Sequence, residues 1–271
     1  MNEVFDIKRL WKLMQYEVVN YIPNFFKSLL VFASVIAAVW IFSLTVDLPV
    51  LPNGRAELVT MLFTVSIVLS PFIVYKDMNN RKKGYIYAMI PASTLEKLLS
   101  MTLISVLVVP VLSYVMLTGT DLILWMLSNM GIGSFHEMDF YNPFADTLAM
   151  VTYDEDLLAC SLPILDGLLY FFGLISYTMM FNTIFRKNKV MKTILFNISM
   201  IFAFIILTAM LVNMTSPEFW EDLFRPLAEF MENKSVAEQC SWLMNVGRCL
   251  NVLFSALFLT ITYFRIKRVN Y

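Results

Sequence analysis

The sequence predicts an all-α polytopic membrane protein with six transmembrane helices, and two observations carry this prediction. Hydrophobic residues make up 59% of the 271-residue chain and charged residues only 15%, and the mean hydropathy is +0.68. This composition is far from that of ordinary globular proteins. Several apolar runs also approach the roughly 20 residues that a helix needs to cross about 30 Å of hydrocarbon. The predicted spans, all within one transmembrane domain, are residues 28–46, 58–75, 98–117, 162–185, 193–213 and 242–264.

Residues 1–27 precede the first span and are predicted to form an amphipathic helix on the inner membrane surface. The apolar residues of this segment fall near one side of a helix, away from Lys8, Arg9 and Lys12. Trp11 is a residue type typical of the membrane interface, which favours this interpretation over a mobile basic tail. The segment lacks the apolar stretch of a cleavable signal peptide, so we expect it to remain on the mature chain.

The distribution of charge predicts the orientation. Most of the 20 Lys and Arg residues lie before the first span, in the loop 76–97, in the turn 186–192 and after the last span. Positive residues near span ends are retained on the cytoplasmic side. Both termini and the 76–97 loop are therefore expected to be cytoplasmic. The segments 118–161 and 214–241, which hold most of the 21 Asp and Glu residues, are expected to be extracytoplasmic loops.

Charged residues avoid the middle of the predicted spans, which argues against an ion-coupled carrier, because such carriers usually bury carboxylates or cations at mid-membrane. Asp166 and Arg248 come near the outer ends of two spans. We expect the Asp166 carboxylate to be wetted at the interface and the Arg248 side chain to extend outward to water.

The two extracytoplasmic loops allow only general expectations. The acidic segment 119–159 is expected to be a solvated face, with attraction of cations as the alternative. Within 214–241, Ser216 and Pro217 are suited to starting an amphipathic helix, which Pro226 would kink. This helix would lie on the outer membrane face or, alternatively, offer a docking surface. The residues 121–130 would either lengthen the third span or lie in the interface.

Signatures of catalysis and of cofactor binding are missing from the sequence. His136 is the only histidine, and the three cysteines are too scattered for a zinc site or a disulfide framework. The chain has no phosphate-binding Gly-x-x-x-x-Gly-Lys loop and no Gly-x-Ser-x-Gly elbow. We therefore expect a protein that is not an enzyme, with no metal, no cofactor and no nucleic-acid partner of its own.

The loop 76–97 is the most informative segment. Ser93-Thr-Leu-Glu96 has the pattern of a capping box, which would start the third span cleanly after Pro91. The preceding "GYIYAMI" is apolar and aromatic, although it lies in a loop predicted to face the cytoplasm. Such a patch is either pressed against the membrane or offered to a protein partner.

The stretch "YIYAMIPASTLEKLLS" resembles the "LPAS.LEK" loop of bacterial ABC-2-type permeases, the membrane subunits of ABC exporters. The layout of spans and termini is similar too. The resemblance implies that residues 79–90 contain a coupling helix that docks on a separate ATP-binding subunit, where ATP and Mg²⁺ would be held. The docking residues would be Arg81, Lys82, Lys83, Tyr85, Ile86, Tyr87 and Met89, and the junction with the third span would be formed by Pro91, Ser93 and Glu96.

The resemblance further implies a bacterial inner-membrane location and a second permease subunit, identical or not, with the substrate path between the two subunits and lipid around them. The function predicted from the sequence is thus a permease subunit of an ATP-driven exporter. The alternative is a non-transporting scaffold or sensor that holds a cytoplasmic partner through the same loop, and a membrane-embedded enzyme is the least favoured hypothesis. The substrate and the residues that line its path are not assigned.

Overall fold

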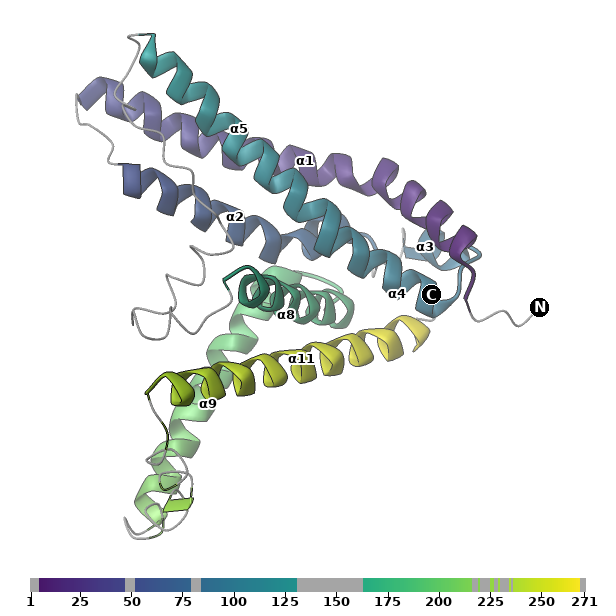
Figure 1. Cartoon of the computed structure of the whole chain (residues 1–271). Helices are drawn as coiled ribbons and strands as arrows, with labels where there is room; N and C mark the ends of the chain where they lie inside the picture. The colour runs from purple at the N-terminus through teal and green to yellow at the C-terminus, as the bar shows by residue number, and fades with distance from the viewer. Residues whose placement is uncertain are drawn as a thin grey trace.

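The structure of the chain is a computed structural model, which describes residues 5–46, 52–78, 84–130, 163–215, 219, 225–226, 229, 234 and 236–268. The described residues form helices joined by turns, with no strand among them, and six of these helices are long and apolar enough to cross a membrane, as the sequence predicts. The chain is therefore a multi-pass membrane protein. The helices, drawn in Figure 1, are α1 (Ile7–Val46), α2 (Pro52–Val74), α3 (Gly84–Met89), α4 (Thr94–Leu103), η1 (Ile104–Val108), α5 (Val109–Asn129), α8 (Pro163–Ile184), α9 (Lys189–Met214) and α11 (Val236–Arg268).

Helix α1 differs from the prediction of a separate interfacial helix over 1–27 followed by a span over 28–46. It is one continuous helix of 40 residues with Pro23 inside it. At 1.5 Å per residue it is about 60 Å long, twice the thickness of the hydrocarbon core. Its N-terminal half buries Leu10, Leu13 and Glu17 against other helices. Leu10 and Leu13, on the apolar side that was expected to contact the membrane surface, thus pack against other helices.

The third span also runs further than predicted, because α4, η1 and α5 form one unbroken rod from Thr94 to Asn129. The short π-helical segment η1 precedes Pro110, which has no N–H and whose ring would clash with the carbonyl of Val106 in a regular α-helix. A widened turn relieves that clash. Asp121, which falls in the segment expected to be an acidic loop, therefore lies within a helix, and the stretch 121–130 lengthens the span.

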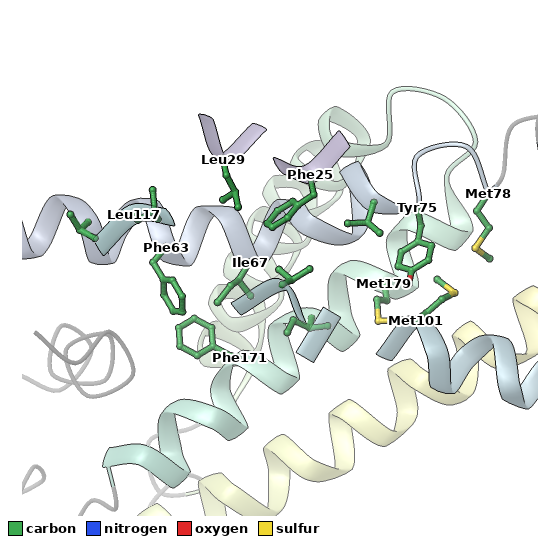
Figure 2. Packing of buried hydrophobic residues seen from close by; sticks show 14 of the residues in the cluster. Phe25, Leu29, Phe63, Ile67, Tyr75, Met78, Met101, Leu117, Phe171 and Met179 are labelled. Atoms are coloured by element: carbon green, nitrogen blue, oxygen red, sulfur yellow. The ribbon is translucent and has the colours of Figure 1, made fainter. Parts of the chain in front are cut away.

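The hydrophobic core lies where α1, α2, α4, α5 and α8 meet (Figure 2). Phe63 of α2 and Phe171 of α8 pack edge to face, with ring centroids 5.6 Å apart. Phe25 and Leu29 of α1 are completely buried beside them. Aromatic pairs of this geometry add about 0.5–1.5 kcal/mol beyond their buried area, so this contact helps to hold α2 against α8.

Helix α9 leaves this bundle and descends from it in Figure 1. None of its most apolar stretch is buried within the chain, and side chains such as Phe202 and Phe204 are more than 60% exposed. A helix that is apolar on all sides is stable only in an apolar environment. This surface is suited to lipid or to other membrane helices.

Helices α8 and α11 approach closely at Gly173. A Cβ atom on Gly173 would lie 2.9 Å from Oδ1 of Asn251, which is closer than real Cβ contacts. Gly173→Ala gains up to about 1 kcal/mol in helix propensity, but its added methyl group has to displace the Asn251 amide. We therefore expect Gly173→Ala combined with Asn251→Ala to be more stable than the sum of the two single variants predicts, because the displaced amide is then absent. Thermal unfolding in detergent measures the three variants, and strictly additive effects would contradict the close approach.

The first residues of α1 and the last residues of α11 lie at the same end of the molecule, together with α3 and the start of α4 (Figure 1). Arg265 near the end of α11 donates to the carbonyl of Ile184 at the end of α8, at 3.4 Å. An even number of spans requires such an arrangement. That this end is cytoplasmic stays a prediction from the charge distribution.

Candidate functional site

The loop predicted to couple the protein to a partner is attached to the bundle by two buried carboxylates. Glu17 of α1 and Glu96 of α4 both have no exposed surface. A buried carboxylate is costly unless hydrogen bonds or opposite charges compensate it. Both carboxylates are compensated by groups from several helices, which makes this end of the bundle a polar junction.

The first set of contacts, here called the Glu17 cluster, consists of Glu17, Tyr75, Tyr87, Lys97 and Ser100. The Tyr75 hydroxyl donates to Oε2 of Glu17 at 3.0 Å, the Ser100 hydroxyl donates to the same atom at 2.7 Å, and the Tyr87 hydroxyl donates to Oε1 at 3.0 Å. Hydrogen bonds to a charged acceptor are stronger than neutral ones. One side chain of α1 thereby joins the end of α2, α3 and α4.

Tyr75 directly follows the last residue of α2, just outside the apolar stretch. Complete burial, and then the negative charge of Glu17, raises the pKa of the Tyr75 hydroxyl well above its usual range. The hydroxyl therefore keeps its proton near neutral pH and can donate to Glu17.

Lys97 of α4 contacts α3 through Tyr87. Its ammonium group donates to the carbonyl of Tyr87 at 3.0 Å and lies 5.4 Å from the centroid of the Tyr87 ring. It also attracts the Glu17 carboxylate electrostatically. The short helix α3, too short to be stable alone, is thus held by its central tyrosine through the hydroxyl, the ring and the backbone.

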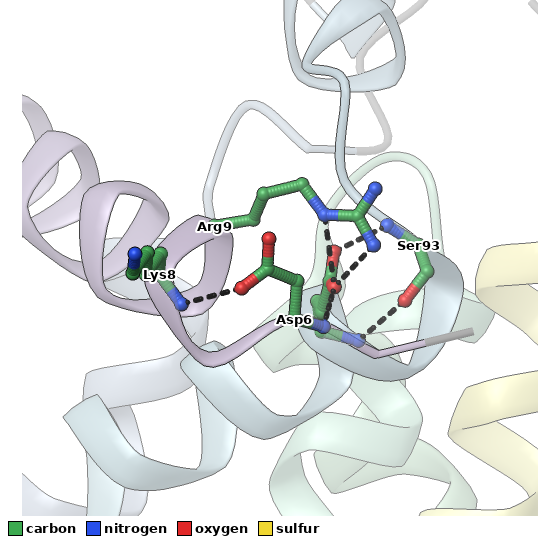
Figure 3. Close-up of polar contacts among 5 residues, drawn as sticks. Asp6, Lys8, Arg9 and Ser93 are labelled. Carbon is green, nitrogen blue, oxygen red and sulfur yellow. Dashed lines mark hydrogen bonds and ion pairs between the residues drawn. The ribbon is translucent and has the colours of Figure 1, made fainter. Parts of the chain in front are cut away.

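The second set, the Glu96 cluster, contains Asp6, Arg9, Ser93 and Glu96 (Figure 3). The predicted capping box is confirmed: the Ser93 backbone donates to Oε2 of Glu96 at 2.8 Å, and the Glu96 backbone donates to the Ser93 hydroxyl at 3.2 Å. Oε1 of Glu96 accepts from Nε and Nη2 of Arg9 at 3.2 and 2.9 Å, and from the backbone N–H of Asp6 at 2.7 Å. The start of the third span is therefore fastened to the start of α1.

Lys189 connects the junction to the other half of the bundle. Its ammonium group donates to the carbonyls of Tyr75 and Lys76, at 3.3 and 3.0 Å, and to Oδ1 of Asn182 at 2.7 Å. These two carbonyls follow the end of α2, where acceptors have no partner within the helix. A cation at this position therefore completes the end of α2 and fixes it to α8 and α9.

The predicted docking residues fall into three groups. Arg81, Lys82 and Lys83 lie outside the described residues. For Tyr85 and Ile86 only the helical backbone of α3 is described. Met89 is 75% exposed, as a docking residue must be, whereas Tyr87 is only 4% exposed and belongs to the core. Tyr87 is thus not accessible to a partner, because its hydroxyl and ring are used inside the bundle.

The predicted junction residues lie together at the start of α4. Pro91 is exposed, and Ser93 and Glu96 form the capping box. Glu17 belongs to this site although it was not among the predicted residues, and the sequence contains a signal for it. Glu17 follows Leu10 and Leu13 at the spacing of one helix face, so a carboxylate falls on the apolar side of the predicted amphipathic helix.

The opposite end of the molecule contains two further ion pairs. Nη2 of Arg55 lies 2.7 Å from Oδ2 of Asp121, and Nε of Arg248 lies 2.6 Å from Oδ1 of Asp166. The expectation that Asp166 and Arg248 are separately wetted was wrong. They neutralise each other, because Asp166 of α8 and Arg248 of α11 lie on the faces by which these two helices pack together.

The buried polar groups of this site join the ends of several helices. Among the described residues, no group of three or more His, Cys, Asp and Glu side chains could hold a metal ion. Searches with family models, among curated proteins and among solved structures found no match to this chain.

Proposed function

We propose that this chain is the membrane-spanning permease subunit of an ATP-driven ABC-2-type exporter, with ATP hydrolysis supplied by a separate subunit. The observation that carries the proposal is the attachment of α3. This helix lies in the segment that resembles the permease coupling loop, and its Tyr87 is joined to α1 through Glu17 and to α4 through Lys97. A displacement of α3 would therefore act on several spanning helices at once.

In this proposal the chain transmits motion and performs no chemistry of its own. Nucleotide binding would close the ATP-binding subunits and displace α3 and the Ser93 capping box. The Glu17 and Glu96 clusters would pass this displacement to α1, α2 and α4 as a rigid unit, and two permease subunits would reorient around the substrate path. Exposed Met89 would contact the ATP-binding subunit, since methionine adapts well to a partner groove.

Co-purification from the native membrane tests the proposal. The parent chain, tagged and extracted in mild detergent, is expected to bring along an ATP-binding protein. Met89→Asp is expected to reduce the recovered partner by about tenfold or more, because a carboxylate buried in an apolar interface costs several kcal/mol. Mass spectrometry of the eluted proteins gives both the identity and the amount of the partner.

Met130→Asp is a matched control, because Met130 is 77% exposed and lies beyond α5 at the opposite end of the bundle. It is expected to retain the partner in full. If the parent brings along no ATP-binding protein, the exporter proposal fails. Recovery of a different cytoplasmic protein that depends on Met89 would favour the scaffold or sensor instead.

A further inference from the structure

A cleft of about 950 Å³ opens near the polar junction, between α1, the end of α2 and the turn from α8 to α9. One wall is apolar and consists of Phe72, Ile73, Val190 and Met191. The apolar stretch of α2 ends at Val74 and that of α9 begins at Lys189. The cleft therefore lies at the level where spanning helices reach the lipid headgroups.

The rim of the cleft is basic. Lys76 and Arg186 line it with exposed side chains, and the structure records no ion pair for either of them within the residues it describes. Lys189 also lines it, but its ammonium group is buried and bonded to three acceptors. Asp77 is the opposing carboxylate in the lining, and it attracts Lys189 electrostatically. Three cations against one carboxylate leave the cleft positive.

The backbone of the cleft is fixed in place. Asn188 lies in the turn between α8 and α9 and lines the cleft. Its φ is 50°, in the left-handed region that asparagine tolerates better than most residues. Lys189 fastens the same turn to the end of α2. Arg186 and Lys76 therefore line the same cleft from two segments that Lys189 joins.

We propose that this cleft binds the phosphate-bearing headgroup of an anionic phospholipid. Lys76 and Arg186 would meet the phosphate, for which an arginine side chain provides two parallel donors. The acyl chains would lie along the apolar wall, which a soluble anion would leave uncovered. The site is independent of the exporter proposal, since it needs no ATP-binding partner.

The test uses the purified full chain in an uncharged detergent, titrated with phosphatidylglycerol or phosphatidylcholine and followed by native mass spectrometry. We expect the parent to bind phosphatidylglycerol at least tenfold more tightly than phosphatidylcholine. Lys76→Gln combined with Arg186→Gln is expected to weaken phosphatidylglycerol binding about 20- to 30-fold, given the usual contribution of a basic residue near an anionic lipid. Both side chains are exposed, so the double variant is expected to fold as the parent does.

Lys8→Gln combined with Lys12→Gln removes the same charge from exposed positions of α1 outside the cleft lining, and it is expected to leave binding within about threefold. An equal loss of phosphatidylglycerol binding in this control would show general attraction to a basic surface and overturn the proposal of a specific site. Unchanged binding in the cleft variant would overturn the proposal directly. Glycerol 1-phosphate, offered as a competitor, is expected to displace no lipid at equal concentration, and displacement by it would identify a soluble phosphate as the occupant.

Discussion

Replacing Glu17 with Ala is expected to lower the free energy of unfolding by about 3–5 kcal/mol, one of the two largest effects predicted for this protein. The substitution removes the acceptor of three hydroxyl groups, those of Tyr75, Tyr87 and Ser100. It also leaves the ammonium group of Lys97 without its nearby carboxylate. Each buried donor left without a partner adds its own desolvation cost. Thermal or denaturant unfolding in detergent measures the loss.

Two comparisons separate this cause from a general effect of mutating α1. Gln15→Ala changes an exposed position of the same helix and is expected to stay within about 0.5 kcal/mol of the parent. Ser100→Ala removes one of the three donors and is expected to cost about 1–3 kcal/mol. If Glu17→Ala unfolds like Gln15→Ala, the Glu17 cluster does not stabilise the junction.

The same substitution also bears on the proposed mechanism. Because the Glu17 side chain is buried, Glu17→Ala removes no side chain from the face of α3 that is proposed to dock. In the exporter proposal this variant would still bind the ATP-binding subunit when folded, while the displacement of α3 would be transmitted less well to α1. The exporter proposal thus predicts that docking depends on Met89 and that transmission depends on Glu17.

The features that the sequence predicts well are those that depend on the lipid environment and on local hydrogen bonding. A helix that crosses the hydrocarbon must be long and apolar, so the six spans are visible as apolar runs. The capping box at Ser93 and Glu96 is a local pattern in which both partners lie within one turn, and it is confirmed.

The features that could not be predicted depend on contacts between distant parts of the chain. An amphipathic pattern has the same period whether its apolar side meets lipid or other helices, so the pattern over 1–27 did not reveal that Leu10 and Leu13 pack inside the bundle. Arg248 and Asp166 are 82 residues apart in sequence. A single sequence records that both are charged, but not that their helices face each other.

Tyr87 shows why the candidate site was predicted only in part. An aromatic residue in an apolar loop segment can be exposed for docking on a partner or buried to anchor the loop. Either role accounts for a tyrosine at this position equally well. The choice depends on a hydrogen-bond acceptor, Glu17, which precedes Tyr87 by 70 positions in the sequence. The prediction of a coupling helix is unaffected, but its anchoring residue has to be distinguished from its docking residue.

At the opposite end of the bundle, breaking the Arg55–Asp121 pair is expected to have an effect as large as that of Glu17→Ala. The two side chains are only 6% and 4% exposed, and two hydrogen bonds, of 2.7 and 3.3 Å, join them across α2 and α5. Arg55→Met would leave the carboxylate of Asp121 buried without this cation. We expect a loss of about 3–5 kcal/mol in unfolding free energy, and a similar loss for Asp121→Leu.

The double variant, Arg55→Met with Asp121→Leu, decides whether the loss comes from the pair or from each side chain separately. Replacing both charges by apolar groups of similar size leaves no buried charge behind, so we expect stability within about 1–2 kcal/mol of the parent. The corresponding single and double variants at Arg248 and Asp166 serve as a comparison. The single variants there are expected to lose less unfolding free energy, because Arg248 is 18% exposed and can be hydrated when its partner is removed. Additive losses at Arg55 and Asp121, with the double variant as unstable as the sum of the single ones, would show that the two side chains act independently and that the ion pair does not join α2 to α5.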